Sequence, residues 1–284
     1  RPKVFPIIMV HLVRVGEAGG FLDSALESVA RNFETELKLQ QKVKGAMAYP
    51  VVVLIVAIIS VIAMLLFVVP TFESLFAGFG SELPLPTQFL VALSRSAAIW
   101  VPILIVVAII VALWYSRNKR EEKVRKAVDT FKVKVPIFGQ LFRKVAIARF
   151  SRNMAIMLAA GVPMLQAIGL VAKVSNNWVV EHALLDAENS VRLGRPFAQP
   201  LAQHDVFPPM VTQMVAVGED SGALDQMLES IAVFYDREVE TAAEQLTSMI
   251  EPLLIVAVGG IIGGMVVALY LPIFTMVTAI QGTV

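Results

Sequence analysis

The 284-residue chain is 57% hydrophobic, its mean hydropathy is +0.72, and only 17% of its residues are charged. These values exceed those of an ordinary globular domain, so we expect part of the chain to lie in a membrane. The formal net charge of +1 gives no reason to expect a nucleic-acid partner, and the absence of cysteine excludes disulfides and thiolate metal sites.

Residues 1–49 are predicted to form the end of a first helical domain. A helix near Pro6–Val15 leads into a small-residue turn, Ala18–Gly20, and then into a long helix with Asp23 near its first turn. The positive end of the helix dipole favours a carboxylate there. Apolar residues recur along one face of this long helix, at Leu22, Leu26, Val29, Phe33 and Leu37.

Three segments are apolar and long enough to cross a membrane. Residues 50–70, 97–115 and 251–280 carry no charged residue or histidine apart from Glu251, at the entry of the third segment. A helix of about 20 apolar residues spans the roughly 30 Å hydrocarbon core of a bilayer. We therefore predict three transmembrane helices, with residues 71–96 forming a loop between the first two.

Basic residues indicate which end of each predicted span faces the cytoplasm. They cluster directly after the second span and before the first, whereas the 71–96 loop contains only Arg95. Because cytoplasmic flanks are enriched in Lys and Arg, we expect residues 1–49 and 116–250 to be cytoplasmic and the loop and the C-terminus to face outward. The flanking basic residues are Lys38, Lys42, Lys44, Arg117, Lys119, Arg120, Lys123, Arg125 and Lys126.

Residues 116–250 are predicted to form a second helical domain. Its first part, Arg117–Lys134, is interpreted as a charged helical extension of the second span. No segment alternates apolar and polar residues clearly enough to predict a strand, so the expected fold class is an all-α membrane protein. Further helices are expected over residues 141–160, 164–174, 178–193, 197–202 and 208–217, followed by a long helix that ends at Pro252.

One stretch of the chain occurs twice. Residues 215–238, VAVGEDSGALDQMLESIAVFYDRE, are identical at half of their positions to residues 13–36, VRVGEAGGFLDSALESVARNFETE, when Gly218 is aligned with Gly16. The shift is 218 − 16 = 202, and it holds without a gap over about 70 residues, which indicates internal duplication.

The same shift aligns Pro70 with Pro272. We therefore expect duplicated cytoplasmic helical-bundle domains. The second copy has about 60 further residues upstream, from Ala146, that have no counterpart before Arg1. Residues 1–49 are accordingly interpreted as the C-terminal part of a domain that is truncated at its start.

Each copy carries one acidic residue on either side of its small-residue turn. These are Glu17 and Asp23 in the first copy and Glu219 and Asp225 in the second, all expected at the start of the long helix. Three interpretations are open: local helix electrostatics with hydrogen bonds to turn amides, contact with a basic partner, and a bound cation. We treat the four residues as candidates for partner contact.

The third predicted span contains Gly259, Gly260, Gly263 and Gly264. Overlapping pairs of small residues four apart let a second helix approach closely, because no side chains separate the two backbones. These glycines are candidates for packing against another span, in the same subunit or in a symmetry-related one. Looser packing within one subunit is the alternative.

Motifs of several catalytic and transport classes are absent from the sequence. It has no G-x-x-x-x-G-K-[ST] phosphate-binding loop, no zinc-ligand spacing among His11, His182 and His204, and no nucleophile elbow. The spans also lack the ionisable residues that a coupled transporter normally requires. We therefore expect neither an enzyme nor a cofactor or metal, and a transporter is disfavoured.

Three stretches resemble the inner-membrane platform proteins of bacterial type IV pilus and type II secretion machines. They are RFSRNMAIMLAAGVPMLQAI (149–168), VFPPMVTQMVAVGEDSGALDQMLESIAVFYDRE (206–238) and EPLLIVAVGGIIGGMVVALYLPIF (251–274), and the resemblance extends over the whole chain. The ending LYLPIF is more similar to the pilus branch of the family than to the secretion branch.

The resemblance implies a non-enzymatic scaffold in the bacterial inner membrane, with two cytoplasmic helical domains and three spans. It also implies partners: a cytoplasmic assembly ATPase, pilin subunits, inner-membrane alignment proteins, membrane lipid and further copies of the chain in a homo-oligomer. Such a platform couples the ATPase to insertion of pilins into the filament. The alternatives are the equivalent platform of a type II secretion or competence pseudopilus system and, less favoured, a transporter built from repeats.

The charge pattern predicts the side of the membrane on which the chain ends. Alkaline phosphatase, which folds only outside the cytoplasm, should be active when fused after Val284 and inactive when fused after Gly194, because basic residues flank only the inner ends of the spans. Green fluorescent protein fluoresces only when it folds in the cytoplasm, so fluorescence from a fusion at Val284 would contradict the three-span topology.

Overall fold

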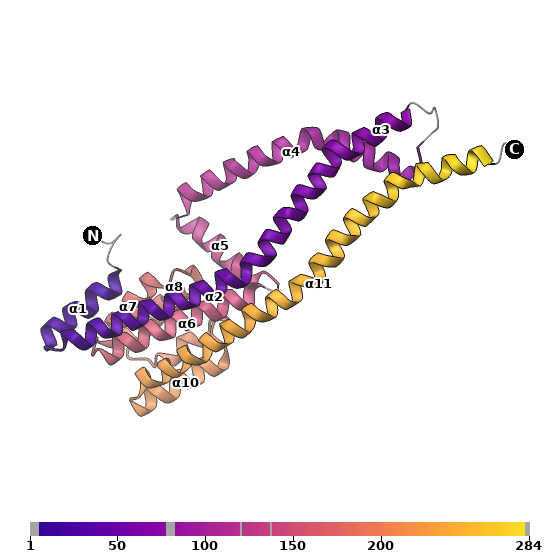
Figure 1. Cartoon of the computed structure of the whole chain (residues 1–284). Helices are drawn as coiled ribbons and strands as arrows, with labels where there is room; N and C mark the ends of the chain where they lie inside the picture. Colours follow the sequence, from indigo (N-terminus) through magenta and orange to yellow (C-terminus); the bar gives the residue numbers. More distant parts are fainter. Residues whose placement is uncertain (1–5, 78–82, 120, 137, 282–284) are drawn as a thin grey trace. The chain divides into compact units, whose positions relative to one another are not determined.

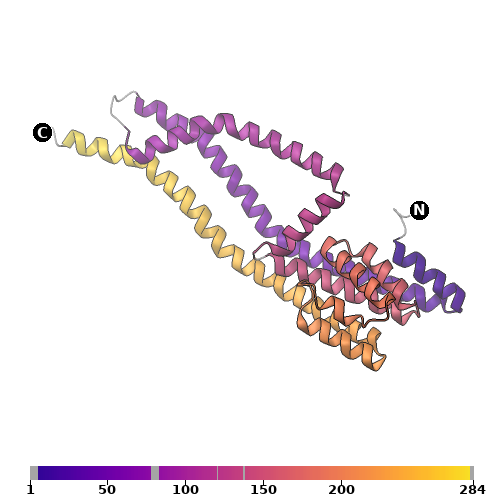
Figure 2. The same ribbon diagram turned by 180° about the vertical axis from the view of Figure 1, so that it is seen from behind.

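The computed structural model (Figure 1, and from behind in Figure 2) describes residues 6–77, 83–119, 121–136 and 138–281, with side chains up to Phe274. Within these ranges all regular structure is helical and no strand occurs, which confirms the all-α prediction. The chain divides into two compact units. We call Arg1–Ala46 with Arg120–Leu246 the helical unit, and Met47–Lys119 with Thr247–Val284 the membrane unit.

The helical unit is organised around α6 (Phe138–Ala159). Leu141, Ile147 and Met157 project in different directions around this helix, yet all three are buried. A helix that is buried on every side is a core helix, and most of the other helices of the unit contribute apolar side chains around it. These are α1 (Ile7–Gly19), the first part of α2 (Leu22–Ala63), α7 (Met164–Val174), α8 (Trp178–Arg192), α9 (Ala198–Leu201), α10 (Pro209–Ser221) and the first part of α11 (Leu224–Gln281). Helix α5 (Glu122–Lys134) also packs against α6.

Basic side chains of α6 pair with both long helices. Arg149 Nη2 lies 3.1 Å from Glu36 Oε1 on α2, and Lys144 Nζ lies 2.8 Å from Glu238 Oε2 on α11. The two glutamates are 238 − 36 = 202 residues apart, so they occupy equivalent positions of the sequence repeat. Both ion pairs are partly buried, where a charge needs a partner. A single helix therefore contacts the same position of both copies.

Three helical stretches of the described chain are long and apolar enough to cross a membrane, and each of them runs through the membrane unit. The three helical stretches concerned are Leu22–Phe76, Leu85–Asn118 and Leu224–Phe274, which confirms the predicted number. The first consists of α2, a π-helix η1 (Met64–Val68) and α3 (Val69–Ala77), the second is α4 (Leu85–Asn118), and the third is α11. They pack through Leu65, Val69, Leu90, Val91, Ala97, Val101, Met265, Ala268 and Leu269.

Pro70 changes the hydrogen bonding of the first membrane helix. In η1 the Val69 N–H donates to Met64 O, one residue further back than in an α-helix. In this pattern each N–H donates to the carbonyl five residues earlier, so residue 70 would donate to Leu65 O. Residue 70 is proline, which has no N–H. The buried Ser94 hydroxyl of α4 donates to Leu65 O instead, at 2.5 Å.

Pro272 also removes a backbone hydrogen-bond donor, in the third membrane helix. An α-helical residue 272 would donate to the carbonyl of Ala268, and proline cannot. The buried Thr87 hydroxyl of α4 donates to Ala268 O, at 2.5 Å. Pro70 and Pro272 are equivalent positions of the repeat, so α4 supplies a hydroxyl donor next to the equivalent proline of both copies.

Several predicted boundaries differ from the structure. Helices α2 and α11 continue through Pro50 and Pro252, because an interior proline removes one hydrogen bond without necessarily ending the helix. Most of the predicted 71–96 loop is helical, since α3 extends to Ala77 and α4 starts at Leu85. Residues 78–82 of that loop and Val284 lie outside the described residues.

The charged extension of the second span is also interrupted, because α4 ends at Asn118 and α5 starts at Glu122. The helix predicted over residues 208–217 is longer than expected, since α10 runs on to Ser221. Gly218, the first residue beyond the predicted helix, lies inside α10.

The proline-associated hydrogen bonds predict a measurable loss of stability. Thr87→Val and Ser94→Ala should each lower the free energy of unfolding by about 0.6–1.7 kcal/mol, the range found for hydrogen bonds between membrane helices. Thermal unfolding in mild detergent measures this change. Ser96→Ala is the matched control, because the exposed Ser96 hydroxyl bonds only to Leu93 O of its own helix. Equal midpoints for Ser94→Ala and Ser96→Ala would contradict the proposed role of Ser94.

Candidate functional site

The two repeated turns have the same backbone geometry. Gly20 has φ 73° and Gly222 has φ 71°, a left-handed conformation that favours glycine at a helix C-terminus. After each of them an amide donates back over the turn at 2.9 Å: Phe21 N to Gly16 O, and Ala223 N to Gly218 O. The helical hairpins α1–α2 and α10–α11 are therefore joined in the same way. The duplication of whole domains stays a prediction.

Gly16 and Gly218 are required by close helix packing at these turns. A Cβ on Gly16 would lie 2.7 Å from Ala25 Cβ, and one on Gly218 would lie 2.9 Å from Leu224 Cα. Both distances are shorter than real Cβ atoms tolerate. The repeated Val-Gly-Glu sequence thus reflects a helix crossing in which only glycine fits.

The acidic residues before the turns do not lie where the sequence analysis placed them. Glu17 and Glu219 are in the last turns of α1 and α10, not at the start of the long helices, because each helix continues to the left-handed glycine. The half-buried Glu219 carboxylate accepts hydrogen bonds from Phe197 N at 2.7 Å and from Ala198 N at 3.2 Å. Its position is thus explained by contacts within the helical unit.

Glu17 has a different environment. Its side chain is exposed, and the positions equivalent to residues 197–198 fall outside this sequence. Asp23 and Asp225 lie in the first turns of α2 and α11, as expected, with Asp23 exposed and Asp225 half-buried. Of the four candidates, Glu17 and Asp23 are exposed in this structure, and Glu219 and Asp225 are half-buried.

Asp225 lies at the edge of a groove in the helical unit between α2 and α11. The groove has a volume of about 490 Å³ and mixes acidic, basic and apolar side chains, including Arg31, Arg152 and Asp236. Arg152 and Asp236 form an ion pair, so part of its charge is already neutralised. In the described residues no group of three or more His, Cys, Asp or Glu side chains is arranged to hold a metal ion.

The apolar stripes of the two long helices are covered to different extents. On α11, Leu228 is fully buried and Val239 is too, whereas the equivalent Leu26 and Leu37 of α2 are 42% and 55% exposed. Helix α2 packs against the core with Ala25, Val29, Asn32 and Leu39 instead. The predicted stripe on α2 is therefore only partly used within this chain.

The glycine face of α11 has no neighbour in the described part of the chain. Gly259, Gly260, Gly263 and Gly264 are exposed, and a Cβ built on any of them meets no atom within 4 Å. The expected packing against another span of the same subunit is thus not observed. Packing against a different polypeptide remains a prediction.

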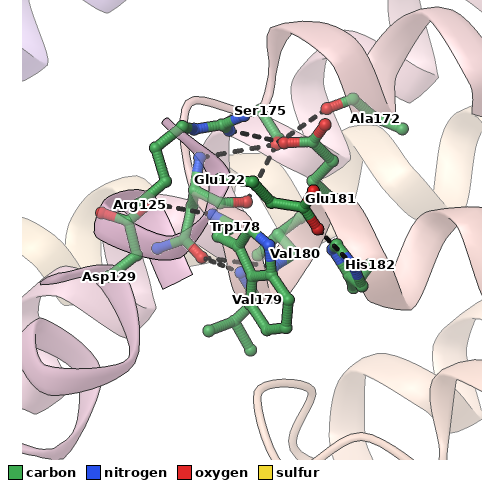
Figure 3. Close-up of polar contacts among 11 residues, drawn as sticks. Glu122, Arg125, Asp129, Ala172, Ser175, Trp178, Val179, Val180, Glu181 and His182 are labelled. Atoms are coloured by element: carbon green, nitrogen blue, oxygen red, sulfur yellow. Dashed lines mark hydrogen bonds and ion pairs between the residues drawn. The ribbon is translucent and has the colours of Figure 1, made fainter. Parts of the chain in front are cut away.

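A polar cluster that the sequence analysis missed joins α5 to α8 (Figure 3). Asp129 accepts a hydrogen bond from Trp178 N at 3.0 Å, and Arg125 pairs with Glu181 at 2.5 Å. The Trp178 ring stacks on His182 with 3.8 Å between centroids, and Lys126 Nζ lies 4.8 Å from the Trp178 ring centroid. The cluster fixes α5, the helix that follows the second membrane helix, to the helical unit.

The sequence of the chain is similar to a known protein family and to several of its members. The profile of the family described as "Type II secretion system (T2SS), protein F" matches residues 1–70 and 150–272. Both matched stretches end at repeat-equivalent positions, since 272 − 70 = 202.

Individual relatives cover nearly the whole chain. The "Type IV pilus assembly protein PilC" of Myxococcus xanthus is 44% identical over 280 residues, which are 99% of this chain and 67% of that protein. The protein of the same name from Thermus thermophilus is 41% identical, over 97% of this chain and 68% of the relative. The "Type II secretion system protein F" of Xanthomonas campestris is 29% identical, over 98% and 68%. The chain therefore belongs to the type II secretion system protein F family, together with the PilC proteins of type IV pilus assembly.

Proposed function

We propose that this chain is the inner-membrane platform of a type IV pilus assembly machine and couples a cytoplasmic assembly ATPase to the insertion of pilin subunits. The observation that supports this proposal most strongly is the family match over both repeat copies, together with 44% and 41% identity to two PilC proteins. Three helices long and apolar enough to span a membrane support an inner-membrane location. The basic flanks support a cytoplasmic helical unit.

The structure also gives the proposed platform a physical basis. Helix α6 binds the equivalent glutamates Glu36 and Glu238 of the two long helices, and both of these helices continue into the membrane unit. A displacement applied to the helical unit would reach two membrane helices through continuous helix. No catalytic chemistry is required for this role, because the proposed ATPase provides the free energy.

A type II secretion platform is the second candidate. The relative named type II secretion system protein F supports it, with 29% identity over nearly the whole chain. The higher identity to the PilC proteins favours the pilus machine. Deleting the gene and counting surface pili by electron microscopy distinguishes the two: loss of pili, restored by the wild-type gene, is expected for a pilus platform. Normal piliation with a loss of secreted enzymes would favour the secretion platform.

The acidic residues at the repeated turns give a paired prediction. Glu17→Lys should leave the protein abundant and folded but unable to assemble pili, because an exposed carboxylate is replaced where a basic partner surface is proposed to bind. Glu219→Lys should instead lower abundance and melting temperature, because two hydrogen bonds to a charged group are lost, each worth about 1.5–3 kcal/mol.

Circular dichroism, protein level and pilus counts separate the two effects, and Glu17→Gln tests whether the charge itself matters. If the Glu17→Lys protein is folded and the cells make as many pili as wild-type cells, the partner-contact interpretation is wrong.

The glycine face yields a prediction about assembly. Gly260→Leu and Gly263→Leu should leave insertion and the stability of the isolated chain unchanged, because a Cβ at either position meets no atom of a neighbouring helix within 4 Å in the described chain. In the assembled complex, the added bulk should separate α11 from a partner helix and reduce complex size on native gels. Val106→Leu, at an exposed position of α4, is the control for added bulk. A complex of normal size with both glycine variants would rule out close packing on this face.

A further inference from the structure

The outer face of α5 carries a stripe that the helical unit does not use. Lys123, Ala127, Phe131 and Lys134 recur at intervals of four, four and three residues, so they lie along one side of the helix. All four are exposed, and Phe131 is 70% exposed, although it is the largest apolar side chain of α5. We call these four residues the α5 stripe.

The cluster with α8 determines which face of α5 is left outside. Arg125 and Asp129 lie on the other side of the helix, where they bind Glu181 and the Trp178 amide (Figure 3). Lys126 packs on the Trp178 ring. Because these contacts fix the rotation of α5 about its axis, the α5 stripe cannot turn inward without breaking them.

The stripe also follows a membrane helix closely. Only three residues separate the end of α4 at Asn118 from the start of α5 at Glu122. Four Cα–Cα steps of about 3.8 Å join Asn118 to Glu122, so this connection is at most about 15 Å long. The α5 stripe therefore begins close to the membrane boundary, on the side that the charge pattern makes cytoplasmic.

The charge of this region fits an anionic surface. Residues 117–126 contain six basic residues and two acidic ones. Arg125 and Lys126 are held in the cluster with α8, which leaves four basic residues for an anionic surface. Clusters of four to eight Lys or Arg directly cytoplasmic to a membrane helix attract anionic lipid headgroups, with about 1 kcal/mol for each residue near the surface. An exposed aromatic ring flanked by lysines also has the amphipathic character of an interfacial helix, whose lysine stems lie along apolar surface while the ammonium groups reach water.

We propose that the α5 stripe binds the headgroup region of anionic phospholipid, so that α5 lies on the inner membrane surface with Phe131 at the level of the headgroups. The proposal concerns this helix alone and does not depend on the pilus machine. It assigns α5 two roles: one face holds the helical unit through Trp178 and the other rests on lipid.

The 284-residue chain allows a direct test, because it contains no cysteine. Phe131→Cys can carry a single nitroxide in nanodiscs of phosphatidylcholine with or without 40% phosphatidylglycerol. Leu193→Cys, 74% exposed and following α8 in the same unit, is the matched aqueous control. The depth of each label follows from the rates at which the nitroxide collides with two reagents. Oxygen is more concentrated in lipid, whereas a nickel complex stays in water.

We expect a severalfold higher oxygen-to-nickel collision ratio at residue 131 than at residue 193 in phosphatidylglycerol nanodiscs. The ratio at 131 should fall toward the control value in pure phosphatidylcholine, in high salt, and when Lys123→Gln and Lys134→Gln are added. Equal ratios at both positions under all conditions would overturn the proposal. A label at 131 that becomes protected only when the assembly ATPase is added would also overturn it, because the stripe would then bind protein.

Discussion

A backbone carbonyl buried between packed helices needs a donor within the protein, because an unpaired buried polar group is costly. Pro70 and Pro272 each remove a donor from a membrane helix, and the structure resolves both deficits through one neighbouring helix. Ser94 donates to Leu65 O, and Thr87 donates to Ala268 O. The two hydroxyls are seven residues apart on the same face of α4, together with the apolar residues that pack the three helices. The arrangement of the membrane unit depends on this pair of contacts.

The helical unit follows a comparable plan. One helix, α6, binds the equivalent glutamates of both long helices through Arg149 and Lys144, and its apolar residues fill the core between them. In each unit a single helix therefore contacts both repeat copies, at equivalent glutamates in the helical unit and next to equivalent prolines in the membrane unit. A scaffold that must move as one body under an external force benefits from such cross-connections, because neither copy can shift without loading the shared helix.

Much of the fold could be predicted from the sequence because its determinants are local. Uncharged runs of about 20 residues identify membrane helices, and glycine at positions 20 and 222 identifies the left-handed end of α1 and α10. The role of Glu219 could not be predicted, since its hydrogen-bond donors at residues 197 and 198 lie more than 20 positions away and meet it only in the folded unit. Prolines 50 and 252 were misinterpreted as helix ends because sequence alone does not tell a tolerated interior proline from a terminating one.

The proline-associated hydroxyls and the α6 ion pairs were missed for a related reason. Ser94, Thr87 and the glutamates at 36 and 238 are ordinary residue types in ordinary local contexts. The alignment of the two repeat copies did contain a signal, because it pairs Pro70 with Pro272 and Glu36 with Glu238. Each pair predicts that both copies need the same kind of contact: a hydrogen-bond donor near the proline and a basic side chain near the glutamate. The partners themselves, on α4 and α6, depend on tertiary packing.

We propose that the helical unit receives force from an assembly ATPase. Purification of the affinity-tagged chain in mild detergent from cells that make the complete machine tests this claim most directly, with the ATPase detected in the eluate by mass spectrometry. We expect the ATPase to elute with the chain in a stable ratio and to be lost when Arg149→Glu and Lys144→Glu disrupt the contacts of α6. An eluate that contains pilin and membrane partners but no ATPase, at wild-type sequence and low salt, would contradict it.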